Sequence, residues 1–529
     1  MADTVREIER KYEAGKDTGA ARLPDLSGAA PVSTVTDEGV RELDAVYYDT
    51  ADRRLAAAGI TLRRRTGGPD EGWHLKLPVA EPATPGARDE TRAPLTVSAI
   101  PRALTSLVRS RTRDVPLAPL MRIVSRREVR HLLAEDGTLL AEASTDTVTA
   151  TRLTDGNLTD GNLTDGTTDA KASAHWTEIE IELAEGADPA LLDTLDPLLR
   201  KAGLRPSKAP SKLARALRET GLGEPPRRTA AGPAAKAPAG DHVLAFLRAQ
   251  AEAVVALDPG ARLGTEDAVH QMRVATRRLR SSFRSYGKVL DRRATDPLGQ
   301  ELKWLAAELG VDRDREVLAE RLRERLDELP RALVRGPVRA RLRTWSTAGR
   351  RGSRRRLTAV LDSARYLTLL DRLDALLADP PLREAAAGPP GAVLAKAMLR
   401  DYGRLAGRVE HALATAPGHD RDTALHDARK AAKRARYAAE AATPALGKEA
   451  KRFAQQMKSV QTLLGDHQDS VMARGTLRAI AAEAEGAGEP TFTFGVLYGR
   501  EERRAEQDER ELPGLWERVA ERISAVSLR

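Results

Sequence analysis

The spacing of apolar residues changes once along this chain and divides it into two kinds of sequence. In the N-terminal part, short runs such as GITLRRRT, GWHLKLP and HWTEIEIEL alternate apolar and polar residues, which is the period of β-strands. From Asp241 onward, apolar residues recur at the i, i+3, i+4 and i+7 spacing of helices. Residues 221–240 have the Pro, Ala and Gly composition of a linker. We therefore predict a multidomain α+β protein with a β domain at 1–220, a linker at 221–240 and an all-α domain at 241–529.

The composition excludes several classes of function. The chain has no Cys, which excludes disulfides, Cys-ligated zinc and thiol catalysis. Aromatic residues make up only 3% of the chain, which leaves few surfaces for stacking bases and disfavours specific nucleic-acid binding. No apolar run approaches the ~20 residues of a membrane span, so we predict no membrane partner and a cytoplasmic location. The formal net charge of +9, which arises mainly after the linker, favours a polyanionic partner.

Charged residues alternate with apolar residues on the predicted strands. Glu7, Glu9 and Lys11 share one face of the first strand, and Glu178, Glu180 and Glu182 share one face of the last. On an open sheet such a face is solvated and carries surface ion pairs worth ~0–1 kcal/mol each. In a closed barrel the same residues turn inward, where they need water and a multiply charged ligand. Carboxylates suit Mg²⁺ and clustered cations suit phosphate, so the second alternative describes a metal-phosphate site.

A series of motifs resembles the CYTH superfamily, the triphosphate tunnel metalloenzymes. EIERK at 7–11 resembles the ExExK signature of that family, and YYDTADRRLAAAGITLRRR at 47–65 resembles its segment that ends in L-R-x-R. The further matches follow in the order of the family: Lys76, ARDE at 87–90, Arg127, Asp146, EIEIE at 178–182, Ser211 and Lys212. The resemblance covers about residues 4–218.

The resemblance implies an eight-stranded antiparallel β-barrel with helices, whose tunnel holds a triphosphate and Mg²⁺ or Mn²⁺. It implies metal ligands at Glu7, Glu9, Asp146, Glu178 and Glu180. It implies substrate-binding cations at Lys11, Arg63, Arg65, Lys76, Arg127 and Lys212. Glu90 is predicted as the catalytic residue that orients water, although Arg88 and Glu90 also fit an ion pair in a loop. His74 and His175 are predicted to lie in the barrel wall with their polar atoms satisfied.

The chain also contains internal repeats of two kinds. The pentapeptide TDGNL occurs twice in residues 154–163, and its turn-forming composition predicts a surface loop. In the helical half, VHQMRVATRRLR aligns with LHDARKAAKRARY, and LGVDRD at 309–314 aligns with LGDHQD at 464–469 at nearly the same offset. Two blocks at one offset predict an internally duplicated helical bundle.

The two aligned helices carry matching basic stripes, each within about 80° of helix surface. They comprise His270, Arg273, Arg277 and Arg280 in the first helix and His426, Arg429, Lys433 and Arg436 in the second. For a single helix a solvated basic face is the alternative interpretation, but the repetition favours a binding surface. The pattern resembles the CHAD domain, the conserved-histidine α-helical domain, which is associated with inorganic polyphosphate. No acidic cluster with metal-ligand spacing occurs in this half, and the Arg-rich run at 331–356 fits either an anion patch or a solvated helix pair.

Together these patterns predict metal-dependent hydrolysis of inorganic triphosphate (tripolyphosphate) in the barrel tunnel and inorganic polyphosphate binding by the helical domain. Related barrels include nucleotide and thiamine triphosphatases and adenylate cyclases, which are alternative activities. A non-catalytic polyphosphate-binding or sensor protein is the alternative from a different class.

Overall fold

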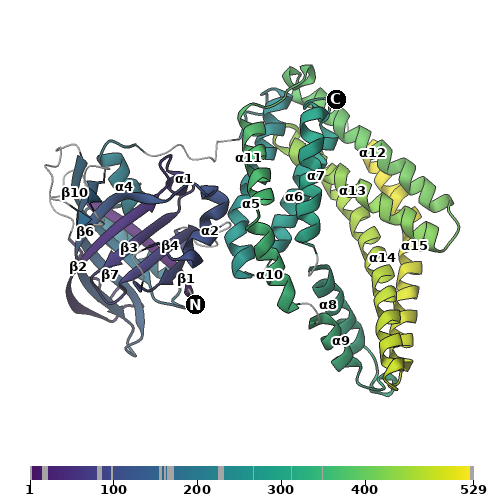
Figure 1. Ribbon diagram of the computed structural model, residues 1–529, viewed down its shortest axis with the longest axis horizontal. Helices are drawn as coiled ribbons and strands as arrows, with labels where there is room; N and C mark the ends of the chain where they lie inside the picture. Colours follow the sequence, from purple (N-terminus) through teal and green to yellow (C-terminus); the bar gives the residue numbers. More distant parts are fainter. Residues whose placement is uncertain are drawn as a thin grey trace. The chain divides into compact units, whose positions relative to one another are not determined.

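The computed structural model describes residues 3–14, 22–79, 86–96, 99–153, 158–159, 162–163, 172–223, 232–265, 267–310, 313–347 and 350–524. The chain divides into two compact units, Met1–Ala230 and Ala231–Arg529 (Figure 1). The first unit is built on strands and the second on helices, as the change in apolar spacing predicts. The boundaries predicted at residues 220 and 241 stay predictions, because the division between the units falls outside the described ranges.

Eight strands of the first unit close into an antiparallel barrel, which confirms the predicted fold class. They are β1 (Asp3–Ala14), β2 (Thr34–Asp49), β3 (Thr61–Thr66), β4 (Gly72–Pro78), β5 (Ala87–Ala93), β6 (Ala118–Leu133), β7 (Leu139–Arg152) and β10 (Ser173–Leu183). Their order around the barrel is β10, β7, β6, β2, β3, β4, β5 and β1, and the pairing of β1 with β10 closes the ring. The short strand β11 (Leu204–Pro206) is added beside β1.

On β10 the alternation places apolar residues outside and carboxylates inside the barrel. Ile179 and Ile181 of β10 are buried in one cluster with Leu192 and Leu195 of the helix α3 (Ala190–Lys201), which covers the outer face. Glu180, between the two isoleucines, therefore points to the opposite side and lines the interior. Of the two interpretations of the alternating charges, the structure therefore agrees with the closed barrel, in which these residues face the interior.

Among the shorter helices α1 (Arg54–Ala57), α2 (Arg102–Thr112) and α4 (Lys212–Glu219), α4 supplies the interior with a lysine. The Ser211 side chain caps α4 by accepting a hydrogen bond from the Ala214 amide. Leu213 and Leu217 anchor α4 in a buried cluster that includes barrel residues such as Trp176. Lys212, the first residue of the helix, is consequently held inside and is only 8% exposed.

Several parts of this unit differ from the sequence-based expectations. The strands β2 and β5 are not predicted by alternation, because neither has a continuous apolar series on its outer face. The interpretation of Arg88 and Glu90 as a loop ion pair is wrong, because both lie on β5 and Arg88 donates to the carbonyl oxygens of Gly59 and Pro210. Of the TDGNL repeat, Leu158–Thr159 and Asn162–Leu163 pair as the short strands β8 and β9. The rest of that predicted loop lies outside the described residues.

The second unit consists of helices packed around a large apolar core. They are α5 (Ala239–Leu263), α6 (Ala268–Ser285), α7 (Arg292–Glu308), α8 (Arg313–Asp327), α9 (Val338–Thr347), α10 (Arg350–Leu361), α11 (Ala364–Ala378), α12 (Pro390–Ala414), α13 (His419–Leu446), α14 (Lys448–Gly486) and α15 (Phe492–Ser524). The hairpins α5–α6 and α12–α13 pack together through α6 and α13, and α14 and α15 follow α13 (Figure 1). The helices α8 and α9 share a smaller core with α14 and α15.

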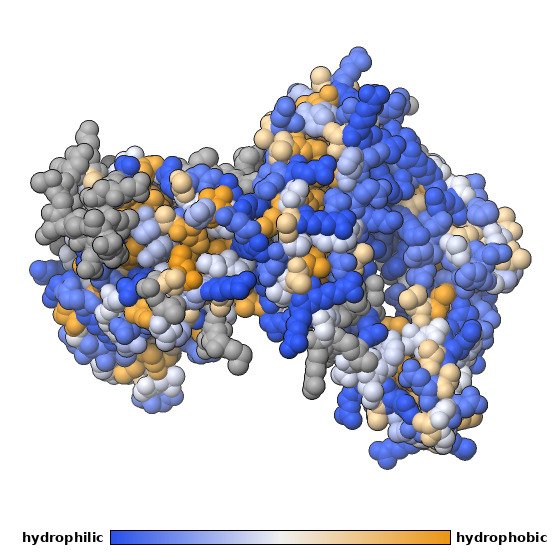
Figure 2. All heavy atoms as spheres, in the orientation of Figure 1, coloured by the Kyte–Doolittle hydropathy of each residue, from blue (hydrophilic) through white to orange (hydrophobic). Residues whose placement is uncertain are grey.

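The surface of this helical unit is mostly hydrophilic on the face that Figure 2 shows. Amphipathic helices produce such a surface when they turn their apolar stripes toward a common core. None of the helices in the described part of the chain has the length and apolar character needed to cross a membrane.

Candidate functional site

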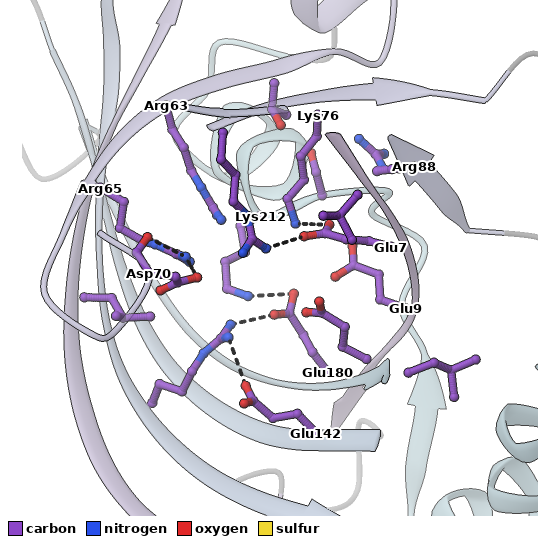
Figure 3. Close-up of a pocket in the computed structure, with 18 of the residues that line it drawn as sticks. Glu7, Glu9, Arg63, Arg65, Asp70, Lys76, Arg88, Glu142, Glu180 and Lys212 are labelled. Carbon is purple, nitrogen blue, oxygen red and sulfur yellow. Dashed lines mark hydrogen bonds and ion pairs between the residues drawn. The ribbon is translucent and has the colours of Figure 1, made fainter. Parts of the chain in front are cut away.

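A cavity of about 360 Å³ occupies the interior of the barrel. Figure 3 shows labelled side chains converging on it from β1, β3, β4, β10 and α4. Every predicted substrate-binding cation lines this cavity: Lys11, Arg63, Arg65, Lys76, Arg127 and Lys212. Glu7, Glu9 and Glu180 line it as well, whereas Glu90, Asp146 and Glu178 are almost fully buried and contact the lining residues from behind. The structure therefore brings the predicted barrel residues together in one place.

Three carboxylates form a compact buried group on the neighbouring strands β7 and β10. One oxygen atom from each of Asp146, Glu178 and Glu180 lies within 4.8 Å of the others. The Nζ atom of Lys212 lies 2.9 Å from an oxygen of Asp146, 2.9 Å from one of Glu178 and 2.6 Å from one of Glu180. Three hard oxygen ligands at this spacing fit a small divalent cation such as Mg²⁺ or Mn²⁺. We call these three carboxylates the acid cluster.

Neighbouring cations lower the pKa of two members of the acid cluster, Asp146 and Glu180, against the effect of burial. Arg127 donates two hydrogen bonds of 2.8 Å to Asp146 and one of 2.7 Å to Glu180. Burial by itself would raise the pKa of Glu180, but the charges of Lys11, Lys212 and Arg127 bring that pKa well below its usual value. For Arg127 the two effects have the opposite signs. Burial lowers its pKa, but the charges of Asp146 and Glu180 outweigh burial and raise the pKa well above its usual value. Anionic oxygens and phosphate-binding cations therefore share one small volume.

Glu7 and Glu90 form a second acidic pair, apart from the acid cluster. Lys76 Nζ lies 2.5 Å from Glu7 and 3.8 Å from Glu90, and Arg92 contacts both carboxylates. Burial raises the pKa of Glu7 to about 7, with Glu90 and Glu182 adding to the effect and Lys76 opposing it. Burial also favours the neutral form of Glu90, but a hydrogen bond with His74 and the charge of Lys76 outweigh it and lower the pKa of Glu90. The five predicted metal ligands thus fall into three groups. Asp146, Glu178 and Glu180 form the acid cluster, Glu7 lies beside Glu90, and Glu9 forms an ion pair with Lys11 at 3.1 Å.

Two arginines of β3 have polar atoms that the protein leaves unsatisfied. The Nε atoms of Arg63 and Arg65 are buried without a hydrogen-bond partner. Arg63 lies 3.3 Å from the Tyr47 hydroxyl and 3.8 Å from Glu90, while Arg65 is paired with Asp70. Burial, together with the charges of Arg63 and Arg127, lowers the pKa of Arg65 to about 9. Buried donors and mutually repelling cations are both stabilised by an anionic ligand.

In the helical unit, the two predicted basic stripes meet where α6 packs against α13. Burial and then the charges of Arg429, Arg277 and Arg273 lower the pKa of Lys433 to about 7, so cations of both stripes lie close together. Arg436 instead forms an ion pair with Glu440 at 3.3 Å, and Glu440 also forms an ion pair with Arg278 at 3.0 Å. The two histidines and Arg280 are half-buried on the same helices.

The glycines of the two aligned LG motifs, Gly310 and Gly465, lie against the corresponding arginines of the two stripes, Arg273 and Arg429. A Cβ atom added to Gly310 would lie 2.8 Å from Cζ of Arg273. A Cβ atom added to Gly465 would lie 3.2 Å from an Nη atom of Arg429. Each glycine therefore leaves room for the guanidinium of the matching stripe, and the same contact occurs in both halves of the predicted duplication.

Comparisons with known proteins cover nearly the whole chain. Residues 5–217 match the CYTH domain and residues 245–478 match the CHAD domain. The chain belongs to the CYTH and CHAD families. The uncharacterized protein MT2285 of Mycobacterium tuberculosis is 41% identical to it over 507 residues, which are 95% of this chain and 94% of the relative. The uncharacterized protein Rv2226 from another strain of that organism has the same identity and coverage.

Solved structures are similar to parts of the chain. PptA from Streptomyces chartreusis is 22% identical, with a TM-score of 0.43, over 53% of this chain and 100% of PptA. The CHAD domain of the plant Ricinus communis is 26% identical, with a TM-score of 0.43, over 55% of this chain and 95% of that structure.

In the helical unit, the structure brings together a group of possible metal ligands that no spacing in the sequence indicates. Asp422, His467 and Glu509 come together from α13, α14 and α15, with His467 Nε2 at 3.4 Å from Asp422 and 3.3 Å from Glu509. No regular spacing could show this group, because each residue comes from a different helix. Arg474 lies 3.3 Å from Asp422 and Arg421 lies 3.0 Å from Glu509, so cations of the protein already balance both carboxylates.

In the CYTH domain, the cavity also holds charged residues that the sequence does not single out as ligands. Glu182 shares the face of Glu178 and Glu180, and Arg92 lies two residues after Glu90, so alternation carries a signal for both. Asp70 belongs to the turn between β3 and β4, where no periodicity identifies it. His74 is in the wall as predicted, with its two ring nitrogens 2.9 Å from Glu90 and from the Asp70 carbonyl oxygen.

Proposed function

We propose that the CYTH domain hydrolyses inorganic triphosphate with Mg²⁺ or Mn²⁺ and that the CHAD domain binds inorganic polyphosphate. The barrel cavity supports this most directly, because the six predicted cations line one small space and the acid cluster lies at its edge. A linear triphosphate is a compact anion that needs several cations at once. Among the described lining residues Tyr47 is the single aromatic one, and its hydroxyl faces Arg63, so a base finds no stacking surface there. This favours inorganic triphosphate over a nucleotide.

Each group of the cavity has a proposed role. Asp146, Glu178 and Glu180 would hold the metal ion, with Glu7 and Glu9 as further ligands. When bound, the ion would neutralise negative charge on the phosphate oxygens. The six cations would hold the phosphoryl groups in place, so that positioning and electrostatic stabilisation supply most of the rate. The hydrogen bond with His74 and the charge of Lys76 outweigh burial and lower the pKa of Glu90, which favours its ionised form, and we propose that it orients water by accepting a hydrogen bond.

A substrate panel tests the proposed activity. Tripolyphosphate, long-chain polyphosphate, ATP and thiamine triphosphate are supplied with Mg²⁺ or Mn²⁺, and phosphate, pyrophosphate and cyclic AMP are measured. We expect the fastest phosphate release from tripolyphosphate and none in the presence of a chelator. Cyclic AMP as the main product would establish a cyclase instead. Absence of turnover on every substrate would establish the non-catalytic alternative.

Replacing Gly465 by Ala should weaken polyphosphate binding without harming the fold. The new Cβ atom would lie 3.2 Å from an Nη atom of Arg429 and push the guanidinium away from its position, which should weaken its contact with phosphate; complete loss of one charge-assisted hydrogen bond, worth ~1.5–3 kcal/mol or about 10- to 100-fold in affinity, is the upper bound. Gly475→Ala on the same helix is the matched control, because nothing lies within 4 Å of its added Cβ atom. Both variants should gain helix stability of up to ~1 kcal/mol. Equal affinities of the two variants, measured by calorimetry, would contradict the placement of Arg429 at the ligand.

Polyphosphate binding should take up a proton at Lys433. Burial, together with the charges of Arg429 and Arg277, lowers its pKa to about 7 in the free protein, and anionic phosphates would offset those charges and raise the pKa toward the usual value of 10.5. The bound state then holds more protons than the free state between these values, so affinity should fall as pH rises, by up to about tenfold per pH unit. Calorimetry in buffers of different ionisation enthalpy measures the proton uptake. Long polyphosphate chains are used because their terminal phosphates, which also titrate, are then a small fraction of the ligand. Lys433→Arg should abolish the uptake but keep the affinity, and uptake that persists in this variant would refute the assignment.

A further inference from the structure

A second group of arginines lies on the CHAD domain beyond the predicted stripes. Arg404 and Arg408 of α12 and Arg434 of α13 line a cavity of about 420 Å³ between these helices, together with Asp401 and Ala431. We call this space the α12 arginine cavity. Arg404 and Arg408 stand at the i, i+4 spacing of one helix face in the sequence, but their neighbour Arg434 comes from another helix, so the sequence does not show that the three meet.

The cations of this cavity are not balanced by the carboxylates beside them. Asp401 is almost fully buried and already bonds to the Ser285 hydroxyl at 2.5 Å and to Arg404 at 2.8 Å. Asp427 is shared by Arg408 at 3.2 Å and Lys430 at 2.9 Å. Arg434 has no ion-pair partner among the described residues. The cavity therefore has a net positive charge.

Burial and neighbouring cations both act against the charged form of Arg434. Burial lowers the pKa of Arg434, and Arg404, Arg284 and Arg408 lower it further against the opposing charge of Asp401. An arginine keeps its proton at any ordinary pH, so the lowered pKa measures an unfavourable energy of the charged form in the folded state. An anionic ligand in the cavity would remove that unfavourable energy.

The positive charge continues from the histidine stripes into this cavity. Burial and the charges of Arg284, Arg277 and Arg434 lower the pKa of Arg280. Arg280 stands one helical turn after Arg277 on α6, and it lies close enough to Arg434 of the α12 arginine cavity for the two charges to repel each other. A chain of phosphates that begins at the stripes would meet cations along this whole path.

We propose that the α12 arginine cavity is a second anion-binding site, which holds the continuing phosphate units of a linear polyphosphate bound at the histidine stripes. The proposal rests on polyphosphate binding by the CHAD domain. It makes the site selective for chain length, because a short chain engages the stripes alone and a long chain engages both.

The test compares two double variants of the full chain with linear polyphosphates of two lengths. Arg404→Gln with Arg408→Gln removes two partly exposed charges, 49% and 45% accessible, from the cavity. Arg356→Gln with Arg365→Gln is the matched control, because each of these arginines is also partly exposed and also pairs with one glutamate, Glu308 or Glu301. Affinities are measured over a salt series with a chelator present, so that the CYTH domain does not consume the ligand.

We expect the cavity variant to bind long chains about tenfold or more weakly and to lose salt dependence, by about 0.7 in the log–log slope for each phosphate contact. Its affinity for short chains should equal that of the wild type. If wild-type protein binds both lengths but the cavity variant matches the control for long chains, the second site is wrong and polyphosphate binding stands. Equal losses for short and long chains would also overturn the inference. If the wild type binds no polyphosphate at all, the proposed function itself fails.

Discussion

Replacing Glu180 by Gln is expected to lower triphosphate hydrolysis by at least about 100-fold, since even indirect supports of a metal ligand contribute about 10- to 100-fold. Glu180 belongs to the acid cluster and also accepts contacts from Lys11, Arg127 and Lys212. The amide keeps the shape of the side chain but loses its charge. The initial rate, measured over a Mg²⁺ and Mn²⁺ titration, should show a higher half-saturating metal concentration as well as a lower maximum.

The matched control for this variant is Glu128→Gln on β6. Glu128 is exposed on the outer face of the barrel and pairs only with the exposed Arg126 among the described residues. Its replacement should leave the rate and the metal dependence unchanged. Thermal unfolding checks that both variants are folded. A Glu180→Gln protein with the wild-type rate at every metal concentration would mean that the acid cluster holds no catalytic metal.

Reversing the charges of Arg273 and Arg429 together should abolish most polyphosphate binding by the CHAD domain. These are the two arginines seated by the LG glycines, one from each half of the duplication. If each contributes one charge-assisted hydrogen bond of ~1.5–3 kcal/mol, the double change to Glu should cost about 100- to 10,000-fold in affinity at low salt. Fluorescence or calorimetric titration with long-chain polyphosphate measures this loss.

A control with the same change in net charge separates a defined site from diffuse attraction. Arg343 and Arg355 are exposed residues of the Arg-rich run at 331–356, and their replacement by Glu should cost less than about tenfold, because exposed charges are screened by salt. That run would then be a solvated helix surface, one of its two interpretations from sequence. Comparable losses from the two double variants would show that only total charge matters.

Periodicity predicts most of this fold because each side of an element meets a different environment. The EIEIE run of β10 shows this, since its isoleucines pack on α3 and its glutamates face the cavity. The strand β5 escapes prediction for the same reason, because its inward positions hold Arg88, Glu90 and Arg92 and its outward positions are not a clear apolar series. Alternation of charge with apolar residues is thus a good guide where the outer face is covered by a helix, and a poor one elsewhere.

Contacts between elements distant in the chain are the part that sequence reasoning misses. The sequence identifies Lys212 as a candidate cation, but its position inside the acid cluster depends on how α4 packs at the barrel. Asp422, His467 and Glu509 meet only because three long helices pass the same point. The α12 arginine cavity likewise depends on the packing of α12 against α13. No local pattern encodes such meetings, whereas the resemblance to known families encodes many of them indirectly.

The position of Lys212 has a consequence for the order in which ligands enter the barrel. Its ammonium group acts as a counterion that is covalently part of the protein. It balances part of the negative charge of the three carboxylates as long as no ligand is bound. A free divalent cation that entered alone would leave this ammonium buried without an opposite charge, which is costly. A phosphate that arrives in the same event offers the ammonium a new partner. We therefore expect the barrel to discriminate against bare metal ions and to admit the cation together with its triphosphate, as one neutralised complex.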